Sequence, residues 1–447
     1  MGWSAVEVYG VMLSCIAMSE PSDPESPLPL VSDSVEPEGV PPLSEPAVVE
    51  AVAVQNIELV ESGEGIQQPE PSRTRMWVKC AIGFVAFAIV FIILVVVGGE
   101  AREFAVAGLQ TWPFAVLAVL AYASHPKGIG GKALTLTYWI LLVGAVGIAS
   151  LGMTAVGVLQ PKLLGGAGAT VTPPTINQIL RIVAAGLALA AAGGIGLSCF
   201  SMWVRKRAAI RLDMDPQSFV HATALATTVT MTLMCMIPLL AVNEPLIVWL
   251  FNPKNGLDLK GSELTLSSTL YGLLWSVPAS FIAVGFPIKR TLQEARVRLA
   301  LVRPSRRQIG MAVAIGLGLA AAAGPVHFVI GILWKGLGMK MTDTSSVEAL
   351  FKNAISPAGA VVVGISAGLG EELIFRGVLQ PRLGILLPAL MFTALHAFQY
   401  DFDALIWVLI LGMVMGWVRK KTNTTTSALL HATYDLVLLL AAYFFDS

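Results

Sequence analysis

Charged residues are scarce in this sequence, and their scarcity excludes most classes of soluble protein. Only 13% of the 447 residues are charged, whereas 55% are hydrophobic, and the mean hydropathy is +0.74. Ordinary soluble domains carry about twice that share of charge. The net charge is zero, and no basic patch remains beyond short loops, so nothing indicates a nucleic-acid partner. The composition predicts an integral, multi-pass protein of the lipid bilayer.

Cysteine is also scarce, and its spacing excludes a cysteine-based metal site. The four cysteines are Cys15, Cys80, Cys199 and Cys235, with no paired metal-binding pattern. Three of them lie in apolar segments, where a thiol usually behaves as a small buried hydrophobe. We predict neither a disulfide nor a catalytic thiolate.

Lysine and arginine are absent from residues 1–72. This segment is rich in Asp, Glu and Pro, a composition that cannot bury enough apolar surface to fold. It predicts a disordered, acidic, Pro-rich tail that either recruits a partner or is a passive extension.

Long apolar runs fill the rest of the chain, and about 20 such residues cross a bilayer as a helix. The sequence predicts an all-α polytopic transmembrane bundle of about 11 spans. They are expected at 76–97, 104–124, 133–159, 179–204, 219–242, 264–287, 308–334, 354–376, 383–398, 402–418 and 427–445.

Basic residues alternate between the predicted loops and therefore indicate an orientation. Clusters at 127–132, 205–211, 289–307 and 419–421 all fall on one side, which the positive-inside rule assigns to the cytoplasm together with the N-terminal tail. Residues 73–290 then form an N-terminal transmembrane region of about six spans with no recognisable motif. Residues 291–307 form a basic cytoplasmic loop in which 293–298 can be a short helix attracted to anionic lipid. Residues 308–447 form a C-terminal domain.

Ionisable side chains stand out within that domain, because charge in a membrane is costly and usually functional. Glu371, Glu372 and Arg376 end an apolar run. Helical periodicity places Glu372 and Arg376 one turn apart on one face, and Glu371 above Phe375 on the neighbouring face. One glutamate is thus expected to be paired with Arg376, which is structural, and the other to stay available.

Two further i, i+4 pairs follow in the next apolar segments: Phe392 with His396, and His431 with Asp435. Three helices can thereby bring a carboxylate, two imidazoles and an acceptor together, which is the equipment for activating water. The alternative is a structural ion pair with core histidines. If 383–398 crosses the membrane fully, His396 lies far from His431, so we expect the Glu371 helix to continue past Gly377 and to break at Pro381.

This order of motifs resembles the CPBP family of intramembrane proteases, which includes the CAAX prenyl endopeptidases and the Abi bacteriocin-immunity proteins. The resemblance covers residues 356–443, and the pattern is Glu-Glu-x-x-x-Arg, Phe-x-x-x-His, His-x-x-x-Asn, with Asp435 where Asn is commoner. Asparagine can donate a hydrogen bond, whereas an ionised aspartate cannot. The resemblance implies that Glu371, Glu372, His396, His431 and Asp435 are catalytic, with Phe375 and Phe392 as packing residues around them.

The resemblance predicts an endopeptidase for a membrane protein or peptide, in which Glu371 is the general base and His396 positions the water. It is compatible with two chemistries: a metal-free water activated by Glu371, which we favour, and a divalent metal such as zinc held by Glu371, His396 and His431. Two other functions are open. One is a catalytically silent scaffold or immunity protein, and the other is a transporter, although no inverted repeat is visible.

Overall fold

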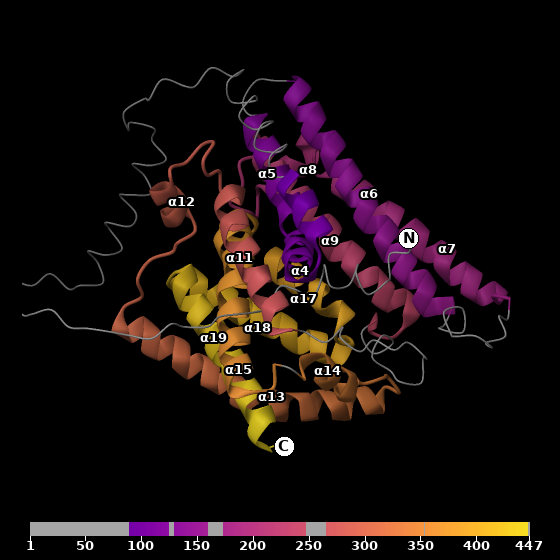
Figure 1. Cartoon of the computed structure of the whole chain (residues 1–447). Coiled ribbons are helices and arrows are strands. Elements are labelled where there is room, and N and C mark those ends of the chain that lie inside the picture. Colours follow the sequence, from indigo (N-terminus) through magenta and orange to yellow (C-terminus); the bar gives the residue numbers. More distant parts are fainter. Residues whose placement is uncertain (1–88, 125–128, 160–172, 247–264, 353, 446–447) are drawn as a thin grey trace, which may run out of the picture. The chain divides into compact units, whose positions relative to one another are not determined.

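Helices make up all the regular structure that we describe. The computed structural model describes residues 89–124, 129–159, 173–246, 265–352 and 354–445 (Figure 1), and within these ranges there is no strand. The predicted all-α class is therefore confirmed. The predicted acidic tail, Cys15 and Cys80 lie outside the described residues.

Eight helices in the described ranges are long and apolar enough to cross a membrane. They are α6 (Ile129–Leu159), α7 (Ile176–Ser198), α9 (Phe219–Val242), α11 (Leu266–Ala283), α13 (Arg306–Gly336), the helix from Pro357 to Leu383, α18 (Phe402–Lys421) and α19 (Thr424–Phe445). The integral, multi-pass character predicted from composition is thus supported by eight apolar helices.

The predicted number of about 11 spans is only approximate, for three reasons. The segment predicted at 104–124 is two helices, α4 (Gly99–Gly108) and α5 (Trp112–Ala123), bent by 45°, and counting them as one span gives nine. The segment at 383–398 is a shorter apolar helix, α17 (Leu386–Leu395) with one tighter turn to Phe398. Of the span predicted at 76–97, only the helical residues 89–97 are described.

Short polar motifs fix where these helices begin. Thr175, Thr291 and Ser305 each accept a hydrogen bond from the third residue of the helix they precede, and a Gln or Glu side chain at that position bonds back to the cap. The capping box at Thr291 starts α12 (Leu292–Arg298), the short helix expected in the basic loop.

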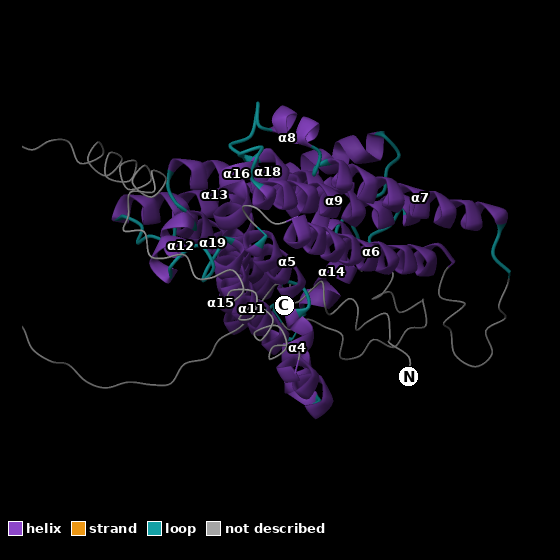
Figure 2. Cartoon of the chain, turned by 90° about the horizontal axis from the view of Figure 1, so that it is seen from above, coloured by secondary structure: helices purple, strands orange, loops and turns teal. Residues whose placement is uncertain are grey.

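The helices pack in two neighbouring groups (Figures 1 and 2). Helices α6, α7 and α9 share an apolar core around Trp139, Leu189 and Met234. Helices α13, α18 and α19 share another around Met415 and Leu430. Helix α17 packs on both α9 and α18 and so links the two groups.

One end of the bundle collects the basic segments. Arg382 lies 3.3 Å from Asp213 of the loop after α8 (Met202–Ala208). Arg298 of α12 donates to the carbonyl of Gly377, and the amide of Thr424 donates to the carbonyl of Ala300. The basic segments at 205–211, 289–307 and 419–421 therefore meet at one end, as their assignment to one side of the membrane requires.

Candidate active site

The helix that carries the two glutamates is not uniform. It begins as α15 (Pro357–Ser366), widens into π-helical turns over η3 (Ala367–Glu371) and η4 (Leu373–Leu379), and ends as α16 (Gln380–Leu383). It continues past Gly377 as predicted, but the predicted break at Pro381 is wrong. Pro381 has no N–H for the carbonyl of Gly377 four residues earlier, but that carbonyl accepts from Arg298 instead, and the chain turns at Gly384, whose φ is +69°.

Glycine brings this helix against α19. A Cβ on Gly368 would lie 2.6 Å from the carbonyl oxygen of Ala428, and one on Gly364 would lie 2.8 Å from that of Ala432. Only glycine permits backbones this close. The close approach places the glutamates within reach of His431, which lies between those two alanines.

Glu372 is fully buried and fully engaged. One carboxylate oxygen, Oε1, lies 3.1 Å from Arg376 and 3.2 Å from Nδ1 of His431. The other, Oε2, accepts a 2.5 Å hydrogen bond from the hydroxyl of Ser427. Every oxygen of this carboxylate therefore has a partner, and Glu372 acts as the anchor of the cluster.

Arg376 is also buried, and its contacts tie the site to α18. It donates 3.1 Å to the carbonyl of Gly412, and its guanidinium lies 4.9 Å above the ring of Phe392 and 5.7 Å from that of Phe375. The expected pairing of Arg376 with Glu372, and the packing of both phenylalanines beside it, is what the structure shows.

Glu371 differs from its neighbour Glu372. Its side chain is buried, but among the described residues no hydrogen bond reaches its carboxylate, and Nε2 of His431 lies 4.0 Å away. A buried carboxylate without hydrogen bonds is costly. The Glu371 oxygens are therefore open to water or to a substrate, whereas both oxygens of Glu372 are occupied.

His431 stands between three carboxylates. Its Nδ1 faces Glu372, while its Nε2 lies 3.4 Å from Asp435 and 4.0 Å from Glu371. Asp435 is the nearer of the two carboxylates that face Nε2. Asp435 therefore orients the imidazole from one turn further along α19.

His396 is not in direct contact with this cluster. Its Nδ1 lies 2.8 Å from the carbonyl of Phe392, which only accepts, so Nδ1 carries the proton and Nε2 has the free lone pair. The ring is stacked on Tyr400 and lies 4.6 Å from Phe392, whose ring in turn is 6.0 Å from His431. Phe392 therefore packs near both histidines.

The sequence-predicted metal set is not assembled in this arrangement. Across the ranges that the structure describes, no three His, Cys, Asp or Glu side chains are grouped closely enough to hold a metal ion. Both nitrogens of His431 face carboxylates, whereas a ligating nitrogen must turn its lone pair to the metal. Glu371, His396 and His431 therefore do not fit a zinc ion as they stand.

Sequence reasoning missed Ser427 and Tyr400. Both continue the i, i+4 spacing that revealed the histidines: Ser427 precedes His431 by four residues, and Tyr400 follows His396 by four. Helical periodicity would have placed Ser427 on the face of His431, whereas Tyr400 lies beyond the helical residues, which end at Phe398.

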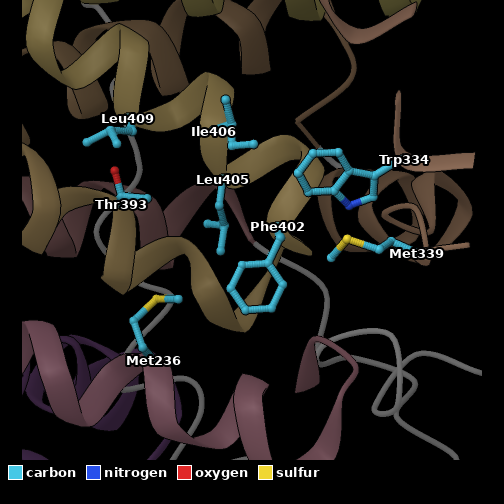
Figure 3. A pocket seen from close by; sticks show the side chains of 8 residues that line it. All are labelled: Met236, Trp334, Met339, Thr393, Phe402, Leu405, Ile406 and Leu409. Carbon is cyan, nitrogen blue, oxygen red and sulfur yellow. The ribbon is translucent and has the colours of Figure 1, made fainter. Parts of the chain in front are cut away.

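An apolar pocket of about 360 Å³ lies next to this region (Figure 3). Its lining combines α17 and α18 with the end of α13, and consists of Met236, Trp334, Met339, Thr393, Phe402, Leu405, Ile406 and Leu409. Thr393 follows Phe392 directly, so the pocket borders the helix that carries Phe392.

Fold and cluster together define a multi-pass helical membrane protein with a buried glutamate–histidine site. Residues 353–437 match the family model described as type II CAAX prenyl endopeptidase, Rce1-like. The matched region is about a fifth of the chain, and the match agrees with the resemblance drawn from the motifs. No curated protein and no solved structure matches the chain.

Proposed function

We propose that the protein is an intramembrane endopeptidase in which Glu371 activates the attacking water. The single observation that carries this proposal is the contrast within one pair of adjacent residues: Glu372 has a partner for each oxygen, while Glu371 is buried and has no hydrogen bond from any described residue. The match of residues 353–437 to an endopeptidase family supports the same reading.

The first step in this mechanism forms the tetrahedral intermediate. Glu371 takes a proton from a water molecule while the water oxygen attacks the carbon of the scissile peptide bond, and the carbonyl oxygen becomes an oxyanion. His431, held by Glu372 at Nδ1 and by Asp435 at Nε2, supplies the positive charge that stabilises this oxyanion. His396 accepts a hydrogen bond from the water through its free Nε2.

The second step breaks the peptide bond. The C–N bond cleaves as Glu371, now a carboxylic acid, returns its proton to the leaving nitrogen, and the products are a carboxylic acid and an amine. Glu371 is thereby restored as a carboxylate, so the cycle needs no further reactant. All chemistry in this scheme comes from side chains of the Glu371 helix, α17 and α19.

A membrane-associated protein or peptide is the substrate class that fits. The cluster is buried among spanning helices, and the neighbouring pocket has a lining that would accept a hydrocarbon chain. The family description adds a prenylated C-terminal peptide as the first substrate to test.

The test is cleavage of a quenched membrane-peptide library, including prenylated peptides, by purified protein in detergent. We expect Glu371→Gln to lower turnover by about 10²- to 10⁴-fold, the usual contribution of a general base, and His431→Ala to do the same. Glu348→Gln, which changes an exposed glutamate of α14 (Thr344–Phe351), is the matched control and should cleave normally. Equal turnover by wild type, Glu371→Gln and His431→Ala would reject the endopeptidase and favour a silent scaffold or a transporter.

A further inference from the structure

The turn that ends α12 contacts both helices that carry the glutamates and His431. The guanidinium of Arg298 donates 3.0 Å to the carbonyl of Gly377 and 3.4 Å to the next carbonyl along the glutamate helix. Two residues later, the carbonyl of Ala300 accepts a 3.2 Å hydrogen bond from the amide of Thr424, the first residue of α19. One short segment, residues 298–300, thus binds two helices that are far apart in the sequence.

Each of these bonds supplies a partner that the helix itself lacks. Position 381 is a proline, so the carbonyl of Gly377 has no amide four residues later. The amide of Thr424 lies in the first turn of α19, where no carbonyl of that helix can reach it. Both residues are buried, and buried backbone groups need a partner. The turn of α12 therefore completes the hydrogen bonding of both helices.

Apolar packing holds α12 in place for these bonds. Ala295 and Leu299 are fully buried and share a small core with Leu373 of the glutamate helix. A Cβ on Gly377 would lie 3.0 Å from the side chain of Leu299. Glycine at this position therefore lets α12 approach closely enough for its arginine to reach the backbone.

The turn itself has a fixed and costly conformation. Ala300 has a φ of +53°, in the left-handed region that favours glycine. Its amide donates to the carbonyl of Val297, and the amide of Leu301 donates to that of Arg296, which is the pattern of a Schellman cap. The Arg296 side chain also donates 3.1 Å to the carbonyl of Leu301. Such a conformation persists only where its surroundings determine it, and here it directs the carbonyl of Ala300 to α19.

The turn lies where the two helices diverge. Along the glutamate helix from Gly364 to Gly368, the close neighbour on α19 changes from Ala432 to Ala428, so the helices run in opposite directions. Helix α19 begins four residues before Ala428, whereas the glutamate helix continues to Leu383. The last turns of the glutamate helix therefore extend past the start of α19, and the turn of α12 bonds to both at this point.

Both bonds are close in sequence to the residues that hold Glu372. Gly377 directly follows Arg376, whose guanidinium lies 3.1 Å from Glu372. Thr424 precedes Ser427 by three residues, and the hydroxyl of Ser427 binds the other oxygen of the same carboxylate. A displacement of either helix at the turn of α12 therefore moves the groups that hold this anchor.

We infer that residues 298–300 form a brace between the two helices of the candidate active site, and that Arg298 is a positioning residue for Glu371 and His431. The brace fixes the separation of the two helices at the end where the glycine contacts stop. Its effect on turnover rests on the proposed function, whereas its effect on the separation of the helices does not.

The experiment replaces Arg298 in the full-length protein, purified in detergent, and measures both turnover and amide hydrogen exchange. Arg298→Leu should lower kcat by about 10- to 100-fold, the order expected for a misplacement of about 1 Å in a site. KM should change little, since Arg298 contacts the helix and not the reacting groups. Exchange should become faster over residues 424–431, a part of α19 that Arg298 reaches only through the brace.

Two further variants separate positioning from a general loss of stability. Arg298→Lys retains a donor for the carbonyl of Gly377 and should recover part of the kcat that Arg298→Leu loses. Arg303→Gln removes an exposed positive charge a few residues beyond the turn and is the matched control. It should behave as wild type does in both measurements.

Two outcomes would overturn the inference. The first is a wild-type kcat in folded Arg298→Leu protein. The second is unchanged exchange over residues 424–431 in that variant, which would mean that Arg298 acts on its own contact alone. The exchange measurement is repeated with Arg298→Leu in the Glu371→Gln protein, which needs no turnover. The brace is thereby tested even if the protein cleaves no peptide and the proposed function fails.

Discussion

Two carboxylates in this protein, Asp403 and Glu371, are both buried but have different surroundings. Asp403, in the first turn of α18, accepts from the backbone amide of Thr342 at 3.1 Å and from its hydroxyl at 2.6 Å, and lies 3.6 Å from His327. Glu371 has only His431 at 4.0 Å. Burial alone therefore does not distinguish a structural carboxylate from one that is available for chemistry, whereas its hydrogen bonds do.

The neighbourhood of Asp403 shows what a structural role looks like. Thr342 also accepts a hydrogen bond from the amide of Asp401. This residue, in the segment between α13 and α14, therefore holds the start of α18 in place. Glu372 belongs with Asp403 in this respect, because both have every oxygen engaged. The comparison can be tested by removing partners from the engaged carboxylates.

Loss of Arg376 should have the largest effect on stability. Arg376→Leu leaves the Glu372 carboxylate buried beside the other acids, and breaking a buried pair in this way costs about 3 to 5 kcal/mol. Denaturation in mixed micelles, compared with the Glu372→Gln/Arg376→Leu double variant, measures this cost. If the single variant were as stable as wild type, Glu372 would not be the structural member of the pair.

Removal of the charge of Asp403 should have a smaller effect, on stability alone. Asp403→Asn weakens its charge-assisted hydrogen bonds to Thr342, at a cost of about 2 kcal/mol. We expect turnover per folded molecule to stay within about threefold of wild type, since Asp403 has no contact with the cluster around His431. A loss of turnover as large as that of Glu371→Gln, with the fold intact, would contradict the distinction between the two carboxylates.

Chelation should have the smallest effect. If Glu371 activates the water without a metal ion, strict removal of divalent metal leaves cleavage unchanged. The reason is that Glu371, His396 and His431 are not grouped as ligands. The measurement is turnover after dialysis against a chelator, followed by addition of zinc. Activity that disappears and returns with zinc would mean that Glu371 is a ligand.

The sequence was sufficient to predict the parts of this protein that depend on periodicity. The Glu372–Arg376 pair follows from a spacing of four residues, and the long spans follow from apolar length. The gathering of Glu371, Glu372, His431 and Asp435 agrees with the motif pattern, while the catalytic roles of these residues stay predictions.

Other features depended on contacts between distant segments. Nothing local predicts that Thr342 reaches Asp403, because 61 residues separate them. The short α17 looked like a full span because its apolar run continues to Phe398, although its helix begins only at Leu386. The ring of Phe392 lies 4.6 Å from that of His396 and 6.0 Å from that of His431, and no local pattern predicts that one side chain packs near both histidines.

The widened turns of the Glu371 helix have a consequence for how one helix can serve two partners. Towards their start, Gly364 and Gly368 lie against α19; towards their end, Arg376 and Gln380 donate to the carbonyls of Gly412 and Gly416 on α18. A π-helical turn holds more residues than an α-helical one and so changes the angular position of every residue that follows. Deleting one residue from either widened stretch would remove the extra residue there and rotate the part of the helix that follows by about 100°. The extra residues in these turns, rather than a kink, thus set the rotation between the face that packs on α19 and the face that packs on α18.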